Sequence, residues 1–158
     1  MATQTKLIQW QLDTSFAMGV TDQIVGAPVV LSKINGGRNI LWDVDIAKNV
    51  VLLSSSGDTL AMDFKNQQAA NQVPIVLSAY NGAPTPTQQL AFWYLGRLGY
   101  ITSIANPNLV LDVQNRVAKD GQTIWGYTFN GSPAQQWKAV DPFAFLAEAE
   151  PEPAAEAV

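Results

Sequence analysis

Cysteine and histidine are both absent from this 158-residue sequence. Their absence excludes disulfides, thiol nucleophiles, metal sites built on thiolate or imidazole, and every catalytic triad that uses an imidazole base. No apolar run approaches the roughly 18 residues of a membrane-spanning helix. We therefore expect a single globular domain with no membrane span, no metal and no cofactor.

Glutamate is missing from residues 1–140, and all four glutamates lie at positions 148, 150, 152 and 156. The body holds eight aspartates against nine lysines and arginines, a net charge of +1, so the acidity belongs to the C-terminal segment. A nearly neutral body has no basic stripe to follow phosphates, which argues against a nucleic-acid partner.

The two ends of the sequence support separate predictions, one about disorder and one about location in the cell. Residues 141–158 form an acidic Ala/Glu/Pro-rich tail that we expect to be partly disordered, although Phe143, Phe145 and Leu146 could fold back onto the body. The N-terminus has no apolar segment after a basic start, hence no signal peptide. This predicts a protein that is cytoplasmic as synthesised, with later release left open.

Short apolar runs rich in Val, Ile and aromatic residues are bounded throughout the body by Gly, Asn, Pro and Ser. Runs of this length and composition are typical of strands, and strong surface helix formers are scarce. The pattern predicts an all-β fold.

An internal repeat is the most informative feature of the sequence. The dipeptide Asn-Gly, a signal for type I′ turns, recurs at positions 35, 81 and 130, each time after a strand-like run. Three segments upstream also align, at residues 16–20, 60–64 and 109–113. Downstream of the Asn-Gly pairs, large apolar residues recur and are expected in the core: Trp42, Leu90 and Trp137.

Three copies of about 47 residues are too few for a propeller, which typically needs at least four blades. The repeats predict one domain over residues 1–140, made of units near 7–45, 46–94 and 95–140. Four short strands in each unit would give a twelve-stranded fold with pseudo-threefold symmetry.

The third copy contains Leu109-Val110-Leu111-Asp112-Val113, Trp125, Asn130-Gly131 and Gln135-Gln136-Trp137. It resembles the ricin-B-type (R-type) β-trefoil lectins, whose hallmark is Gln-x-Trp near the end of each repeat, and the resemblance runs from about residue 16 to 138. It implies a β-trefoil that binds sugars, often galactose or N-acetylgalactosamine, with one shallow site available per repeat.

The resemblance also implies roles for particular residues of the third copy. Asp112 takes the carboxylate position, Trp125 the stacking position and Gln135 that of an amide partner, with Asn130 nearby. Ala134 stands where the family often has Asn. An aromatic ring packs on the C–H face of a sugar while a carboxylate accepts hydrogen bonds from adjacent hydroxyls, so the residue types suit the chemistry.

The internal comparison supports Trp125 as a ligand contact. Its counterparts Val30 and Val76 are much smaller, whereas a core position tends to keep its volume across repeats. A local repacking around Trp125, or a turn-capping role for Asp112, remains the structural alternative.

The other two copies match the family pattern less well. In the second copy Asp63 and Gln88 define a second candidate site without an aromatic residue. In the first copy, Gly19 and Val30 replace the aspartate and the aromatic residue, so the site is expected to be lost.

The function expected from the resemblance is a non-enzymatic lectin whose partners are glycans of glycoproteins or glycolipids. One shallow site binds weakly, so a homo-oligomer or a partner subunit is expected to supply avidity. The alternative is a β-trefoil protease inhibitor acting through exposed loops such as 54–59 or 81–87.

A glycosidase is disfavoured because no motif marks a pair of catalytic carboxylates. Asp43 and Asp45 share one face of an expected strand, where we expect them to be solvated.

Overall fold

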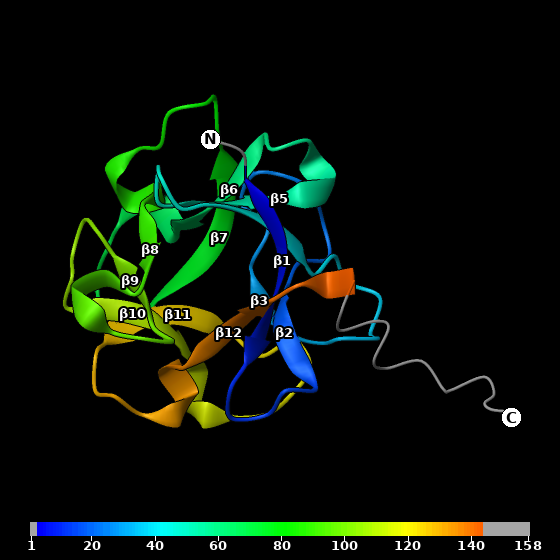
Figure 1. Cartoon of the computed structure of the whole chain (residues 1–158), viewed down its shortest axis with the longest axis vertical. Helices are drawn as coiled ribbons and strands as arrows, with labels where there is room; N and C mark the ends of the chain where they lie inside the picture. The colour runs from blue at the N-terminus through cyan, green and yellow to red at the C-terminus, as the bar shows by residue number, and fades with distance from the viewer. Residues whose placement is uncertain (1–2, 144–158) are drawn as a thin grey trace, which may run out of the picture.

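The computed structural model of the chain describes residues 3–143 (Figure 1). Its elements are strands joined by turns and short 3-10 helices, and all twelve strands belong to one sheet. The strands are β1 (Gln4–Trp10), β2 (Phe16–Gly19), β3 (Val30–Lys33), β4 (Leu41–Asp45), β5 (Val50–Leu53), β6 (Leu60–Phe64), β7 (Val73–Ala79), β8 (Leu90–Phe92), β9 (Ile101–Ser103), β10 (Leu109–Val113), β11 (Ile124–Thr128) and β12 (Trp137–Val140). The 3-10 helices are η1 (Ser54–Ser56), η2 (Lys65–Gln67), η3 (Pro86–Gln88), η4 (Tyr94–Gly96), η5 (Gln114–Arg116) and η6 (Pro133–Gln135).

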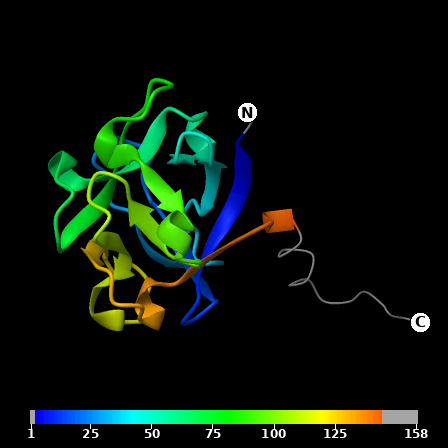
Figure 2. The same ribbon diagram turned by 60° about the vertical axis from the view of Figure 1, so that its left-hand side comes forward.

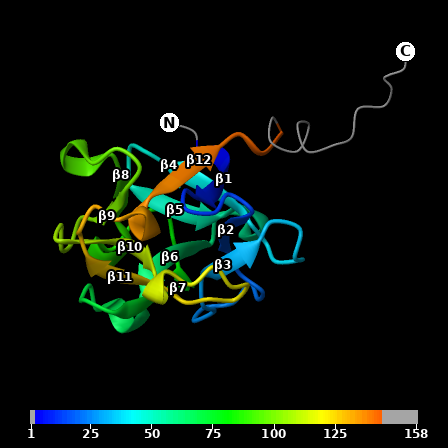
Figure 3. The same ribbon diagram turned by 90° about the horizontal axis from the view of Figure 1, so that it is seen from below.

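Six of the strands close into a barrel, seen from below in Figure 3. Strand β1 pairs with β4 and β12, β4 pairs with β5, and β8 pairs with β9, all antiparallel. Single backbone bonds of 2.7 Å close the two remaining junctions, from Leu90 N–H to the Asn49 carbonyl and from Trp137 N–H to the Gly99 carbonyl. The barrel therefore has no free edge between neighbouring units.

The other six strands form three hairpins: β2–β3, β6–β7 and β10–β11. Isolated bridges and the β7–β11 pair join the hairpins to one another, through Pro28 and Val76, Val30 and Thr123, and Trp125 and Pro74. Barrel plus three hairpins is the threefold all-β architecture predicted from the sequence, which is confirmed.

The strand register supports the alignment of the three repeats. Gly19 pairs with Val30, Asp63 with Val76 and Asp112 with Trp125. Residues that were matched by sequence therefore occupy the same place in each hairpin.

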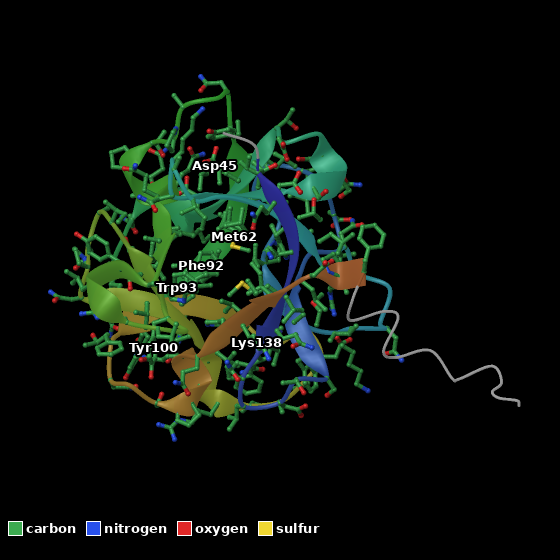
Figure 4. All side chains as sticks on the ribbon, viewed as in Figure 1. Asp45, Met62, Phe92, Trp93, Tyr100 and Lys138 are labelled. Carbon is green, nitrogen blue, oxygen red and sulfur yellow. The ribbon has the colours of Figure 1, made fainter. Side chains whose placement is uncertain are left out.

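The core lies inside the ring of strands, where Met62 sits near the centre of the view in Figure 4. Trp42, Leu90 and Trp137 are at most 2% exposed, which confirms their prediction as core residues. The indole N–H of Trp42 donates to the Met18 carbonyl and that of Trp137 to the Leu111 carbonyl, both at 3.0 Å. Each buried indole thus has the partner that burial requires.

The Asn-Gly pairs do not form the predicted type I′ turns. None of the three asparagines has a positive φ, and Gly36 has none either. The strand before each pair does not hydrogen-bond to the strand after it, so no tight hairpin is needed there. Two of the asparagines instead accept a bond from the backbone two residues on: Asn81 from Ala83 N–H and Asn130 from Ser132 N–H.

Residues 141–143, at the orange end of the coloured ribbon, follow β12 away from the barrel (Figure 2). Asp141 Oδ1 accepts a bond from the Phe143 N–H, and the Phe143 side chain is 82% exposed. The predicted disorder of the tail, and the fold-back of Phe145 and Leu146, concern residues 144–158 and lie outside the described residues. Within residues 3–143, no helix has the length and apolar character to cross a membrane.

Candidate functional site

An open depression of about 210 Å³ lies over the β10–β11 hairpin of the third repeat. The cross-strand pair Asp112 and Trp125 places a carboxylate and an indole side by side in it. Its lining residues come from both strands, the turn after β10, the loop after β11 and the turn before β7 of the second repeat: Gln72, Asp112, Val113, Asn115, Arg116, Trp125, Tyr127, Asn130 and Ser132.

The carboxylate of Asp112 is held by two side-chain donors. Trp125 Nε1–H donates to Oδ1 at 3.1 Å, and Gln135 Nε2–H donates to Oδ2 at 2.9 Å. Asp112 is only 7% exposed, but it still lines the depression. A carboxylate has about four acceptor positions, so each oxygen keeps one for a ligand hydroxyl.

Burial raises the pKa of Asp112 above its ordinary value, because desolvation penalises the charged form. The hydrogen bonds from Gln135 and Trp125 and the nearby positive charge of Arg116 oppose this rise by stabilising the carboxylate. The donors that orient the carboxylate therefore also favour its charged, accepting form.

Gln135 is completely buried and connects the site to the loop after β11. Besides the bond to Asp112, its Nε2 donates to the Thr128 carbonyl at 2.9 Å, and its Oε1 accepts the Asn130 N–H at 2.9 Å. The sequence analysis expected Gln135 as an amide partner in sugar binding. The structure places it behind the carboxylate, as the residue that positions Asp112.

The indole of Trp125 stacks on the ring of Tyr127, with centroids 5.7 Å apart and planes inclined by 17°. Both rings line the depression, and both belong to the same face of β11 because they are two residues apart. Tyr127 was not among the predicted site residues, although period-two alternation from Trp125 along the expected strand points to it.

Other lining residues were missed for different reasons. Asn115 and Arg116 follow β10 directly, in the 3-10 turn η5, and chain proximity to Asp112 was the available signal. Gln72 belongs to the second repeat and reaches the depression because its N–H bonds to the Gly126 carbonyl at 2.7 Å. Nothing local in the sequence marks that contact.

The second repeat builds a related arrangement, with a depression of about 300 Å³ that Asp63, Val76 and Ser78 line. Asp63 is fully buried, and its oxygens accept the Phe64 N–H at 2.7 Å and the Ser78 hydroxyl at 2.8 Å. Gln88 does not reach Asp63 directly, since its Nε2 donates to Ser78 Oγ at 2.8 Å. Ser78 stands at the strand position that Tyr127 has in the third repeat. A serine hydroxyl therefore replaces the aromatic ring, and it donates a hydrogen bond to the carboxylate of Asp63.

The first repeat has no carboxylate at this place. A Cβ on Gly19 would lie 2.5 Å from Ser32 Oγ and 3.0 Å from Ile40 Cγ2. The place that an aspartate side chain would take is therefore occupied by Ser32 and Ile40.

A separate carboxylate group lies where β4 meets the turn before β6. Asp43 and Asp45 are 9% and 7% exposed, so the expectation that they are solvated is wrong. Asp43 accepts a bond from Thr5 Oγ1 at 2.6 Å, and Asp45 accepts the Lys48 N–H at 3.0 Å. These contacts come from β1 and from the β4–β5 turn, and they give the two carboxylates structural partners.

Asp58, in the turn before β6, completes this group. Desolvation, followed by a hydrogen bond to Asp43 and its negative charge, raises the pKa of Asp58 to about 6. Among residues 3–143, no cluster of three or more acidic side chains is arranged to hold a metal ion.

No protein-family model matches the sequence, and no curated protein matches it either. Solved structures do match. The designed threefold-symmetric protein ThreeFoil is 26% identical with a TM-score of 0.74, over 87% of this chain and 98% of that one. The Rhizoctonia solani agglutinin is 16% identical with a TM-score of 0.74, over 89% and 96%.

A third match is the C-half of an earthworm R-type lectin, solved in complex with GalNAc. It is 16% identical with a TM-score of 0.67, over 86% of this chain and 97% of that one. These likenesses, together with the barrel and its three hairpins, define the protein as a β-trefoil.

Proposed function

We propose that this β-trefoil is a non-enzymatic, carbohydrate-binding lectin whose site is the depression of the third repeat. The observation that carries the proposal is Asp112, a carboxylate oriented by Trp125 and Gln135 at an open surface with acceptor positions to spare. Solved trefoils with sugars bound, such as the earthworm lectin with GalNAc, support it.

In this proposal Asp112 accepts hydrogen bonds from two adjacent hydroxyls of a galactose or N-acetylgalactosamine ring. The stacked pair Trp125 and Tyr127 packs against the apolar C–H face of the sugar. Asn130 lines the rim of the depression, and Gln135 acts by holding Asp112 in place.

The second-repeat set of Asp63 and Gln88 is left out of the proposed site. Its carboxylate has no exposed surface and is bonded to Ser78. That difference supplies a matched control, because the same substitution can be made in both repeats.

A glycan array probed with the wild type, Asp112→Asn and Asp63→Asn tests the proposal. Asp112→Asn should lose roughly 10- to 100-fold in affinity, since a hydrogen bond to a charged group contributes about 1.5–3 kcal/mol. Asp63→Asn, if circular dichroism shows it folded, should bind as the wild type does.

Two outcomes would contradict the proposal. Binding that survives in folded Asp112→Asn moves the site elsewhere. A wild type that binds no glycan removes the lectin function, and a protease-inhibition assay then tests the loop-based alternative.

A further inference from the structure

Arg116 stands beside the carboxylate of the third-repeat depression without a structural partner. It is the last residue of η5, its side chain is exposed, and it lines the depression with Asp112. Its positive charge opposes the rise that burial causes in the pKa of Asp112, yet among the described residues its side chain forms neither a hydrogen bond nor an ion pair.

The other two arginines of the described chain are engaged. Arg38 forms an ion pair with Asp120 at 2.7 Å. Arg97 donates to the Pro107 carbonyl at 2.8 Å and lies 4.2 Å from the centroid of the Phe129 ring. Packing and pairing explain those two side chains but not Arg116.

The backbone turn that carries Arg116 occurs in the second repeat as well, but an arginine stands in it only in the third repeat. Asn115 and Arg116 have φ values of 57° and 55°, and Asn66 and Gln67 of η2 both have 57°. The second repeat therefore makes the same left-handed turn beside its own carboxylate with a neutral glutamine. The backbone does not require a charge there.

From this placement we infer that the third-repeat site recognises an acidic saccharide, a galactose-type sugar that carries a carboxylate or sulfate group. The inference rests on the proposed lectin function. Asp112 accepts the ring hydroxyls, and the acidic substituent lies on the Arg116 side of the depression. A guanidinium donates two parallel hydrogen bonds to a carboxylate or sulfate, which makes arginine suited to such a group.

The positions of the positive and negative charges in the depression favour an acidic sugar over a neutral one. Arg116 and Asp112 do not form an ion pair, so the guanidinium keeps its donors for a ligand anion. An acidic substituent placed at Arg116 is neutralised there, while one placed at Asp112 is repelled. Charge therefore fixes the orientation of the sugar as well as its class.

Isothermal titration calorimetry on the full-length protein tests the inference with four probes: methyl galactoside, galacturonic acid, 6-O-sulfogalactose and inorganic sulfate. The wild type should bind at least one of the two acidic sugars about tenfold more tightly than methyl galactoside. Raising the salt concentration should weaken binding of the acidic sugar and leave methyl galactoside unaffected.

Two substitutions separate a local contact from a general charge effect. Arg116→Gln installs the residue found at this turn in the second repeat, and it should bring acidic and neutral sugars to equal affinity. Lys65→Gln removes one positive charge from the equivalent turn in the second repeat and should change nothing.

The inference is overturned if the wild type does not prefer an acidic sugar, if Arg116→Gln keeps the preference, or if Lys65→Gln loses it equally. Inorganic sulfate that binds as tightly as the sulfated sugar would also overturn it, because the site would then be a simple anion site. If neither neutral nor acidic sugars bind, the proposed lectin function fails as well. Binding of methyl galactoside alone refutes only the acidic specificity.

Discussion

Replacing Gln135 by methionine should test whether this amide positions the carboxylate of the site. Methionine has nearly the same length and flexibility, but it lacks the amide hydrogen bonds. The change removes three bonds: the donations to Asp112 Oδ2 and the Thr128 carbonyl, and the acceptance from Asn130 N–H.

The loss in the free energy of unfolding depends on how deeply each of the three bonding partners is buried. The bonds to the Thr128 carbonyl and the Asn130 N–H are only partly buried, so their loss costs about 1 kcal/mol each. Asp112 is buried and loses a bond to its charged form, which costs about 1.5–3 kcal/mol. The buried methionine recovers part of this, so the free energy of unfolding should fall by about 2–4 kcal/mol, or roughly 10 °C in Tm.

Gln88→Met in the second repeat is the matched control. Gln88 also makes three bonds, to Ser78 Oγ, the Ala79 carbonyl and the Thr85 N–H. Urea unfolding should show a similar destabilisation of both variants. Glycan affinity at a temperature where both are folded should fall only for Gln135→Met.

Two results would refute this reasoning. A free energy of unfolding for Gln135→Met within about 1 kcal/mol of the wild type would show that the bonds contribute little. Equal losses of glycan affinity in both variants would show that the third repeat does not hold the site.

Three further expectations follow from the structure. Because burial raises the pKa of Asp112, glycan affinity should fall on acidification at a higher pH than an ordinary aspartate would give; titrations over a pH series check this, and a flat profile contradicts it. Desolvation and the neighbouring Asp43 raise the pKa of Asp58 from 3.8 to about 6 in the folded state, so the folded state loses stability as the pH rises through that window. This loss, about 1 kcal/mol after solvent screening, should vanish in Asp58→Asn when urea unfolding is compared at pH 4 and 7. Gly19→Asp would crowd Ser32 and Ile40 and should lower the free energy of unfolding by about 1–3 kcal/mol, which an unchanged denaturation midpoint would disprove.

The sequence predicted those features that recur in every repeat. Large apolar residues at positions 42, 90 and 137 identify the core, since packing keeps volume constant at symmetry-related places. The resemblance to R-type lectins, rather than the repeat, predicted Asp112 and Trp125 in one site, and the two residues pair across the β10–β11 hairpin.

Features that depend on contacts between distant segments could not be predicted in this way. The Asn-Gly pairs carry a strong local turn signal, but the turn type depends on whether the flanking strands pair, and here they do not. Asp43 is buried because Thr5 and Asp58, distant in the chain, lie against it. Gln72 enters the depression from a neighbouring repeat, where no spacing rule points to it.

The pairing of β1 with β12 has a consequence for how the molecule is made. Leu7 pairs with Val140 and Trp10 with Trp137, so the first strand joins the last across about 130 residues of chain. During synthesis β1 emerges from the ribosome long before this partner exists, and the barrel cannot close until β12 has emerged. Contacts of such wide sequence separation slow folding. The early repeats must therefore wait with an open edge, and completion of the fold is set by release of the final strand.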